Sequence, residues 1–165
     1  MWRWILALDL GFWLIVISIA FPPAPRLVWN ASASAPIGLY WVSPGAAVIK
    51  GDTVIAWTPA RVRRLAAERR YVPVNVPLVK RVAGVEGDRV CAIGAAISVN
   101  GRTVATRKVS DGQGRPMPWW SGCRTLREGE YFLLMPDVAD SFDGRYFGVT
   151  EEGDIIGRAQ LLWAR

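Results

Sequence analysis

The 165-residue chain contains no histidine and only two cysteines. Without histidine, the Ser-His-Asp triad of the common serine hydrolases cannot form, so a serine nucleophile in this chain would need a different base. Zinc sites are built mainly from histidine and cysteine, and the scarcity of both argues against one, while carboxylates alone suit only harder metals. We therefore predict a protein without a bound metal or a cofactor.

Internal repeats and low-complexity linkers are also missing, and the length suits one folded domain. Charge is scarce in residues 2–21, where Arg3 and Asp9 are the only charged residues of an apolar run. This run is about as long as a helix that crosses the hydrocarbon core of a bilayer. Pro22, Pro23 and Pro25 follow it and end any helix. The pattern predicts a single membrane-spanning helix.

We expect residues 1–21 to form a retained N-terminal membrane anchor and residues 22–165 to form the functional domain. Arg3 and the terminal amine favour a cytoplasmic N-terminus, whereas Arg26, close after the span, favours the opposite orientation. We expect the first orientation, which places the domain outside the cytoplasm. The alternative is a secretory signal that is cleaved, with Ser18 and Ala20 as its small residues.

The net charge of +6 comes partly from RVRRLAAERR, residues 61–70, which is the one segment outside the anchor that reads as a helix. A basic helix face exposed to solvent is the simplest interpretation, and contact with anionic lipid headgroups is the alternative. No known nucleic-acid-reading motif accompanies the charge, so we expect no nucleic-acid partner.

The rest of the chain predicts a mostly β fold. Short runs rich in β-branched and aromatic residues alternate with glycine, proline and aspartate. Asn100-Gly101 lies between two alternating runs and predicts a type I′ hairpin, whereas residues 112–122 have the composition of a loop. The expected strands lie in GLYWVS, DTVIAW, LVKRVAGV, DRVCAI, ISVNGRTVA, YFLLM and DIIGRAQLLW.

The stretch NASASAPIGLY, residues 30–40, offers Ser32 and Ser34 as candidate nucleophiles. Lysine can replace histidine as the base if it is neutral, and burial among apolar groups can lower its pKa by roughly 3 to 5 units. Lys80 is the candidate, because strand alternation places it on the same face as Leu78 and Val82. An edge-strand lysine that reaches solvent is the alternative interpretation.

Four blocks of the sequence, in this order, resemble the bacterial type I signal peptidases: VIKGDTVIAW, LVKRVAGVEGDRV, SFDGRYFG and IIGRAQLLW. Within that family, NASASAPIGLYW with SFDGRYFG is most similar to the TraF-type peptidases of conjugative plasmid transfer, which carry Ser-x-Pro-x-Gly-Leu-Tyr. General signal peptidases carry Ser-Met-x-Pro instead. The resemblance implies a coiled β-sheet or barrel core behind a single transmembrane helix, and a membrane-anchored Ser/Lys endopeptidase.

The resemblance also implies roles for individual residues. Ser34 matches the nucleophile and Lys80 the general base, while the Ser34 N–H and the Ser32 hydroxyl would stabilise the oxyanion. Ser32 stays a competitor for the nucleophile, because the spacing to proline departs from the general pattern. Ser141 would orient the Lys80 amine. Arg145 matches the family arginine, and Asp143 would form an ion pair with it. A direct catalytic role of Asp143 is the alternative.

From the same resemblance we expect a protein of the bacterial inner membrane that crosses it once, with its catalytic domain in the periplasm. Its partners would be the lipid bilayer, a precursor protein (a pilin or a secreted preprotein) and components of a conjugation apparatus. Cleavage would follow small residues, and the acyl-enzyme could also give a cyclic product. The alternatives are a non-catalytic, membrane-tethered β module and, less well matched, a self-cleaving repressor.

Two further expectations concern residues outside this constellation. Cys91 and Cys123 suit an oxidising compartment, and a disulfide between them would fix the return of the loop at 112–122; two buried free thiols are the alternative. Met117, Trp119 and Trp120 are expected to form an exposed apolar patch near the membrane surface, unless they cover an edge of the core.

Overall fold

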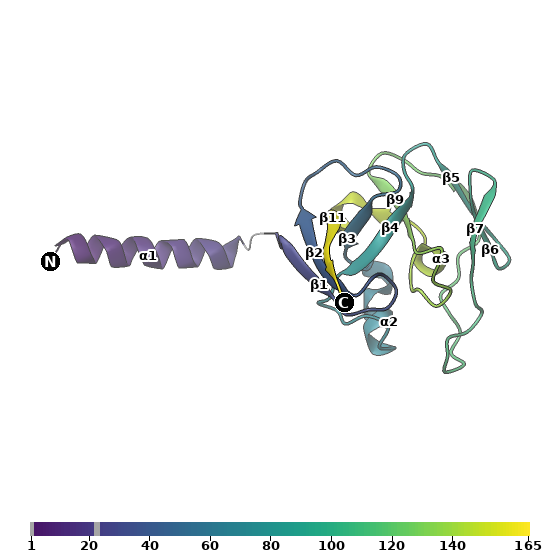
Figure 1. Ribbon diagram of the computed structural model, residues 1–165, viewed down its shortest axis with the longest axis horizontal. Coiled ribbons are helices and arrows are strands. Elements are labelled where there is room, and N and C mark those ends of the chain that lie inside the picture. The colour runs from purple at the N-terminus through teal and green to yellow at the C-terminus, as the bar shows by residue number, and fades with distance from the viewer. Residues whose placement is uncertain (1, 22–23) are drawn as a thin grey trace.

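A computed structural model describes residues 2–21 and 24–165 of the chain. The apolar run forms helix α1, Trp2–Ala20, none of whose residues is buried. By its length and composition α1 could cross a membrane, and a signal sequence near the N-terminus would have the same properties. After α1 the chain enters a β-rich body (Figure 1).

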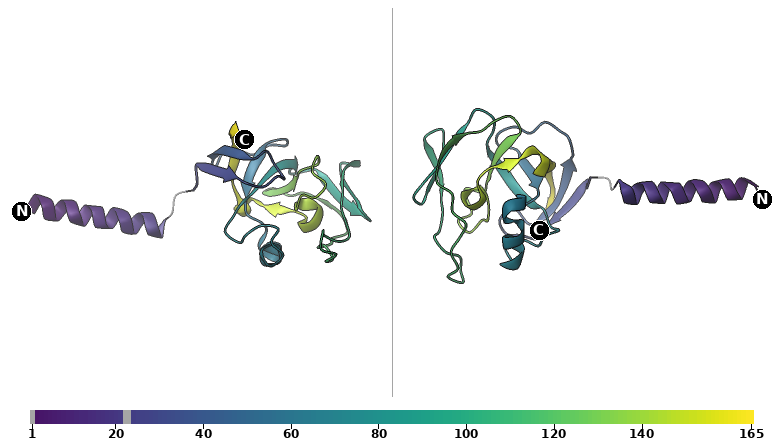
Figure 2. Two further views of the ribbon diagram at one scale, coloured as in Figure 1. Left: turned by 60° about the horizontal axis from the view of Figure 1, so that its bottom comes forward. Right: turned by 180° about the vertical axis from the view of Figure 1, so that it is seen from behind.

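The predicted β fold is confirmed: two antiparallel sheets make up this body (Figures 1 and 2). The larger sheet has the order β1-β2-β11-β3-β4-β9-β10, and the smaller one has the order β7-β6-β5-β8. The strands are β1 Leu27–Asn30, β2 Gly38–Ser43, β3 Thr53–Ala56, β4 Leu78–Gly84, β5 Arg89–Ile93, β6 Ala96–Val99, β7 Arg102–Thr106, β8 Gly122–Thr125, β9 Glu130–Leu134, β10 Thr150–Glu151 and β11 Ile155–Ala164.

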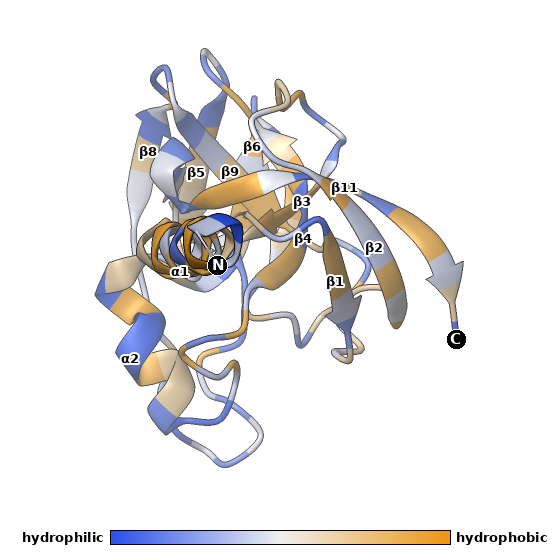
Figure 3. Ribbon diagram, turned by 90° about the vertical axis from the view of Figure 1, so that its left-hand side faces the viewer, coloured by the Kyte–Doolittle hydropathy of each residue, from blue (hydrophilic) through white to orange (hydrophobic). Residues whose placement is uncertain are grey.

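Helices are few. The basic segment forms α2, Ala60–Glu68, close to the predicted range, and its charged residues stand out in Figure 3. A short third helix, α3, Gly144–Phe147, was not predicted, and a 3₁₀ turn, Glu152–Asp154, precedes β11. All four residues of α3 are buried, so tertiary packing rather than helix propensity holds it in place.

The long strand β11 gives the larger sheet its curvature. Its register shifts between Ile155 and Gly157 and again between Leu161 and Trp163, and such bulges increase local bending and twist. Gly38 is required where β2 meets the end of β11, because a Cβ at this position would lie 2.0 Å from the Trp163 carbonyl oxygen. The close contact brings the chain's C-terminal strand beside β2.

Leu78, Lys80 and Val82 on β4 are buried and Arg81 points to solvent, as predicted. Val79 is buried as well, so this part of the strand is covered on both faces. Lys80 therefore lies in the interior of the larger sheet, whose buried residues include Val54, Ile55 and Leu133. In Figure 3, β3, β4 and β9 carry apolar colouring, as expected for strands of this core.

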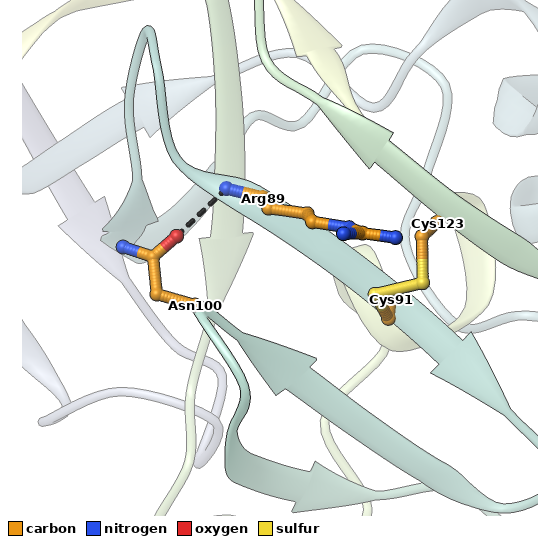
Figure 4. Close-up of a disulfide and its surroundings, with 4 residues drawn as sticks. All are labelled: Arg89, Cys91, Asn100 and Cys123. Carbon is orange, nitrogen blue, oxygen red and sulfur yellow. Dashed lines mark hydrogen bonds between the residues drawn. A yellow bond between two sulfur atoms is a disulfide. The ribbon is translucent and has the colours of Figure 1, made fainter.

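The Asn100-Gly101 hairpin is also confirmed. It joins β6 to β7, with φ of 51° at Asn100 and 78° at Gly101, as a type I′ turn requires. The Asn100 side-chain oxygen accepts a hydrogen bond from the Arg89 backbone N–H at 2.8 Å (Figure 4). In the same sheet, Cys91 on β5 lies directly opposite Cys123 on β8, and a disulfide joins them.

The predicted exposed patch in the 112–122 loop is wrong for two of its three residues. Trp120 packs beside the core and donates from Nε1 to the Gly144 carbonyl at 3.0 Å. Met117 packs against the cluster that contains Phe142. Only Trp119 is exposed, and the Arg107 guanidinium lies 3.4 Å from its ring centroid. The loop therefore closes an edge of the core.

Candidate active site

Ser32 and Ser34 lie on the loop of residues 31–37, which joins β1 to β2. The loop is closed by the pairing of Asn30 with Gly38, the last register pair of these strands. The two serine Oγ atoms are 3.0 Å apart, and the Ser34 N–H donates to the Ser32 Oγ at 3.3 Å. Both hydroxyls and one backbone amide therefore converge on one small volume.

Lys80 approaches this loop from β4. Its side chain is only 1% exposed, yet its Nζ has two hydroxyl partners, Ser34 Oγ at 3.1 Å and Ser141 Oγ at 2.8 Å. Burial lowers the pKa of Lys80 from 10.5 to about 8; the Asp143 carboxylate opposes this shift and the Arg145 guanidinium adds to it. An amine with this pKa is neutral in a substantial fraction of molecules at mildly alkaline pH, and a neutral amine can accept a proton.

Asp143 and Arg145 form a buried ion pair behind Lys80, with side chains 0% and 1% exposed. The Asp143 carboxylate accepts from Arg145 Nε at 2.8 Å and from the Met135 N–H at 3.0 Å, and it caps the N-terminus of α3 through the Arg145 N–H. The Arg145 guanidinium also donates to the carbonyls of Thr106, Met135 and Ala139. Both groups are thus fully occupied within the protein.

A cavity of about 540 Å³ opens onto the serines and Lys80. Most of its wall is apolar, so it suits a neutral, extended chain segment better than a highly charged ligand. Tyr71 and Asp140 also line the cavity and add polar atoms to its wall. The apolar lining includes Val28, Trp29, Val72, Val76, Leu78 and Phe142.

The structure thus brings Ser32, Ser34, Lys80 and Ser141 into one connected set, although the loop, β4 and the segment before α3 are far apart in the sequence. Asp143 and Arg145 lie in the next layer, and the Cys91–Cys123 disulfide belongs to the other sheet. Among residues 2–21 and 24–165, no group of three potential His, Cys, Asp or Glu ligands is placed to hold a metal ion.

Sequence reasoning missed the cavity walls from residues 71–77, which lie in an irregular segment without a periodic pattern. It also missed Asn30, which is buried beneath the serine loop. The sequence does contain a signal for Asn30, because it is a polar residue at the end of a strand, directly before a loop.

Comparison with known proteins gives a consistent result. The family model described as "Signal peptidase, peptidase S26" matches residues 1–164. The chain is 39% identical over 147 residues to a plasmid transfer protein TraF of Escherichia coli, covering 81% of this chain and 82% of the relative. It is 33% identical over 144 residues to a probable conjugal transfer protein TraF of Sinorhizobium fredii, covering 79% and 73%.

Among solved structures, the chain is similar to a signal peptidase I from Enterococcus faecalis V583. The TM-score is 0.40 at 19% sequence identity, over 68% of this chain and 97% of the other.

Proposed function

Because the chain belongs to the signal peptidase family, peptidase S26, we propose that it is a membrane-anchored serine endopeptidase with Ser34 as the nucleophile and Lys80 as the general base. The proposal rests above all on one observation: the Lys80 amine is buried, has a lowered pKa, and lies 3.1 Å from the Ser34 hydroxyl. A buried lysine without a carboxylate in direct contact is costly, and a catalytic base accounts for that cost.

The reaction begins with Lys80 neutral. Its Nζ takes the Ser34 proton as Oγ attacks the carbonyl carbon of the substrate peptide bond. The Ser34 N–H and the Ser32 hydroxyl donate to the resulting oxyanion. The Lys80 ammonium then gives its proton to the leaving amine, which departs as the new N-terminus. Lys80 then takes a proton from a water molecule as the water oxygen attacks the ester carbonyl. The bond between the acyl carbon and Ser34 Oγ breaks, the Lys80 ammonium returns its proton to Oγ, and the product leaves with a new carboxyl terminus.

Two groups support Lys80 in this scheme. Ser141, which is 1% exposed, accepts a hydrogen bond from Nζ at 2.8 Å and holds the amine toward Ser34. Asp143 acts through its ion pair with Arg145, which fixes the segment that carries Ser141. A direct catalytic contribution of Asp143 is the less favoured alternative, because its carboxylate oxygens are already occupied by backbone and guanidinium donors.

We place the active site at the membrane surface. In this proposal residues 1–21 are the retained anchor and residues 22–165 the catalytic domain, on the periplasmic side of a bacterial inner membrane. Only the short segment 22–26 separates the anchor from β1, and it reaches at most about 18 Å. Leu27, Trp29 and Trp163 near that junction are about half exposed, and tryptophan favours the membrane interface.

The substrate is expected to be a precursor protein that enters the cleft as an extended strand. Strand β1 lies at an edge of the larger sheet and lines the cleft through Val28 and Trp29, so its unpaired backbone groups can pair with such a strand. The relatives are named as plasmid and conjugal transfer proteins, which supports a role in conjugative transfer. Within that role we propose a pilin precursor as one substrate. Small side chains would precede the cut, and aminolysis by the substrate's own terminus would yield a cyclic product.

The test is cleavage by the full-length protein in detergent micelles. The substrates are a fluorogenic peptide with alanine at the first and third positions before the scissile bond, and a candidate pilin precursor whose products are weighed. Ser34→Ala and Lys80→Met should abolish cleavage. The matched controls Ser98→Ala and Lys50→Met, on the smaller sheet and at an exposed ion pair, should retain it. Linear and cyclic products differ by the mass of one water.

A non-catalytic, membrane-tethered module of the transfer apparatus is the second candidate. Under that function the Ser34→Ala and Lys80→Met proteins would support plasmid transfer as well as the unsubstituted protein. Loss of transfer in both variants, with normal protein levels, favours the peptidase.

A further inference from the structure

Asn30 is enclosed by the loop that carries the two serines. It ends β1, its side chain is buried, and its backbone pairs with Gly38 at the other end of the loop. The side chain therefore lies inside the turn formed by residues 31–37, where loop backbone groups surround it.

Four hydrogen bonds join the Asn30 side chain to that backbone. Its Oδ1 accepts from the Ser32 N–H at 3.0 Å, and its Nδ2 donates to the carbonyls of Ser32, Ala35 and Pro36 at 2.9, 3.2 and 3.0 Å. The two amide hydrogens thus serve three carbonyls. Only an amide side chain combines one acceptor and two donors in this shape.

These bonds hold the Ser32 residue from both sides, at its N–H and at its carbonyl. The restraint leaves the Ser32 hydroxyl 3.0 Å from the Ser34 Oγ and within reach of the Ser34 N–H. From β2, the Tyr40 hydroxyl adds a hydrogen bond of 2.8 Å to the Pro36 carbonyl. The loop is therefore anchored at its start and at its end, and the serines lie between.

We infer that Asn30 is a positioning residue that prebuilds the oxyanion site by holding Ser32 and the Ser34 N–H in their places. The inference rests on the proposed peptidase function for its catalytic consequence. Oxyanion donors are effective because they are fixed before the reaction, so that no reorganisation is needed when charge develops. Asn30 is among the residues that line the cleft, but its side-chain amide is bonded to the loop backbone, so it would act on the reaction through the loop and not on the reacting atoms.

Asn30→Asp is the sharpest test, because it keeps the size and the acceptor of the side chain and removes both hydrogens. The new carboxylate would face three carbonyl oxygens with nothing to donate, and the loop would have to move away from it. Asn100→Asp is the matched control. It makes the same chemical change at the β6–β7 hairpin, in the smaller sheet.

With the alanine-containing fluorogenic peptide and the full-length protein in micelles, Asn30→Asp should lower kcat about 100- to 1000-fold with little change in KM. This is the signature of losing a group that acts only in the transition state. The same change in a Ser32→Ala background should cost less, because one of the two donors that Asn30 positions, the Ser32 hydroxyl, is already gone. Asn100→Asp should cleave normally.

Cleavage by Asn30→Asp within threefold of the unsubstituted rate would overturn the inference, as would an equal loss in the Ser32→Ala background. Amide hydrogen exchange gives a readout that needs no turnover. Peptides that cover residues 30–38 should exchange at least tenfold faster in Asn30→Asp and unchanged in Asn100→Asp, and unchanged exchange in both variants would also overturn it. If the unsubstituted protein cleaves nothing, the proposed function fails, and exchange alone decides the role of Asn30.

Discussion

Replacing Lys80 with methionine should change how the stability of the protein depends on pH. Methionine matches the length of most of the lysine stem and suits the apolar surroundings of β4, but it carries no charge at any pH. The buried amine, by contrast, has a pKa lowered by desolvation to about 8 from 10.5. The difference in unfolding free energy between the two proteins should therefore change with pH in a defined direction.

The sign follows from proton binding. Because the folded pKa lies below the unfolded one, the unfolded chain holds a proton between pH 8 and 10.5 that the folded chain has released. The stability of the unsubstituted protein should thus rise with pH across this window. At about 1.4 kcal/mol per pKa unit, the rise is about 3 kcal/mol, which is also the cost of the charged amine at pH 7.

Methionine removes that cost but leaves the buried Ser141 hydroxyl without its 2.8 Å partner, a loss of about 1–3 kcal/mol at every pH. At pH 7 we expect Lys80→Met to be as stable as the unsubstituted protein or about 2 kcal/mol more stable. Near pH 10.5 it should be less stable by about 1–3 kcal/mol.

Guanidinium unfolding of both full-length proteins in the same detergent, followed at several pH values from 7 to 10.5, measures this difference. Other groups titrate in both proteins and cancel in the comparison. A difference in unfolding free energy that stays constant over the whole range would refute the buried, low-pKa amine. Lys50→Met, at an exposed ion pair, is the matched control, because exposed pairs contribute little to stability.

Two further predictions concern parts of the molecule away from Lys80. The rings of Trp29 and Trp163 lie 5.7 Å apart and are exposed, and replacing both with serine should weaken the binding of anchor-cleaved protein to liposomes. The control Trp119→Ser should bind as well as the unsubstituted protein. Equal binding by the unsubstituted protein, the double variant and the control would contradict the membrane-facing assignment. Reducing the disulfide, whose cysteines are 32 residues apart, should lower the unfolding free energy by about 3–4 kcal/mol in the chain-entropy model, and guanidinium titration with and without a reductant tests this.

The sequence was most informative where a local rule agrees with the tertiary structure. Strand alternation alone placed Lys80 on a buried face, and Asn100-Gly101 alone required a hairpin. The family resemblance selected the serines and the segment that begins at Ser141, and in the structure these residues meet at hydrogen-bond distance. Their catalytic roles stay predictions until the variants are assayed.

Other features depend on contacts between distant segments. Tryptophan in a glycine- and proline-rich loop suggests an exposed anchor, but Trp120 finds a hydrogen-bond acceptor in Gly144 and a neighbour in Phe132, which no local pattern encodes. Helix α3 is too short to be predicted from periodicity and depends on the Asp143 cap. The role of Asn30 is visible only once its loop is closed.

The ion pair behind Lys80 raises a last question, whether Asp143 contributes to catalysis through its charge alone. In the intact protein its carboxylate raises the pKa of Lys80 while Arg145 lowers it, so the two effects oppose each other. Asp143→Asn removes the carboxylate that raises the pKa of Lys80 and keeps the Arg145 guanidinium that lowers it, so this pKa should fall further. The alkaline rise of kcat/KM should then shift to lower pH, even though the unpaired buried Arg145 destabilises the protein. Rates measured well below the unfolding temperature separate the two consequences. An unshifted profile would mean that Asp143 does not tune the amine electrostatically, and a shift to higher pH would mean that its carboxylate acts by a different route.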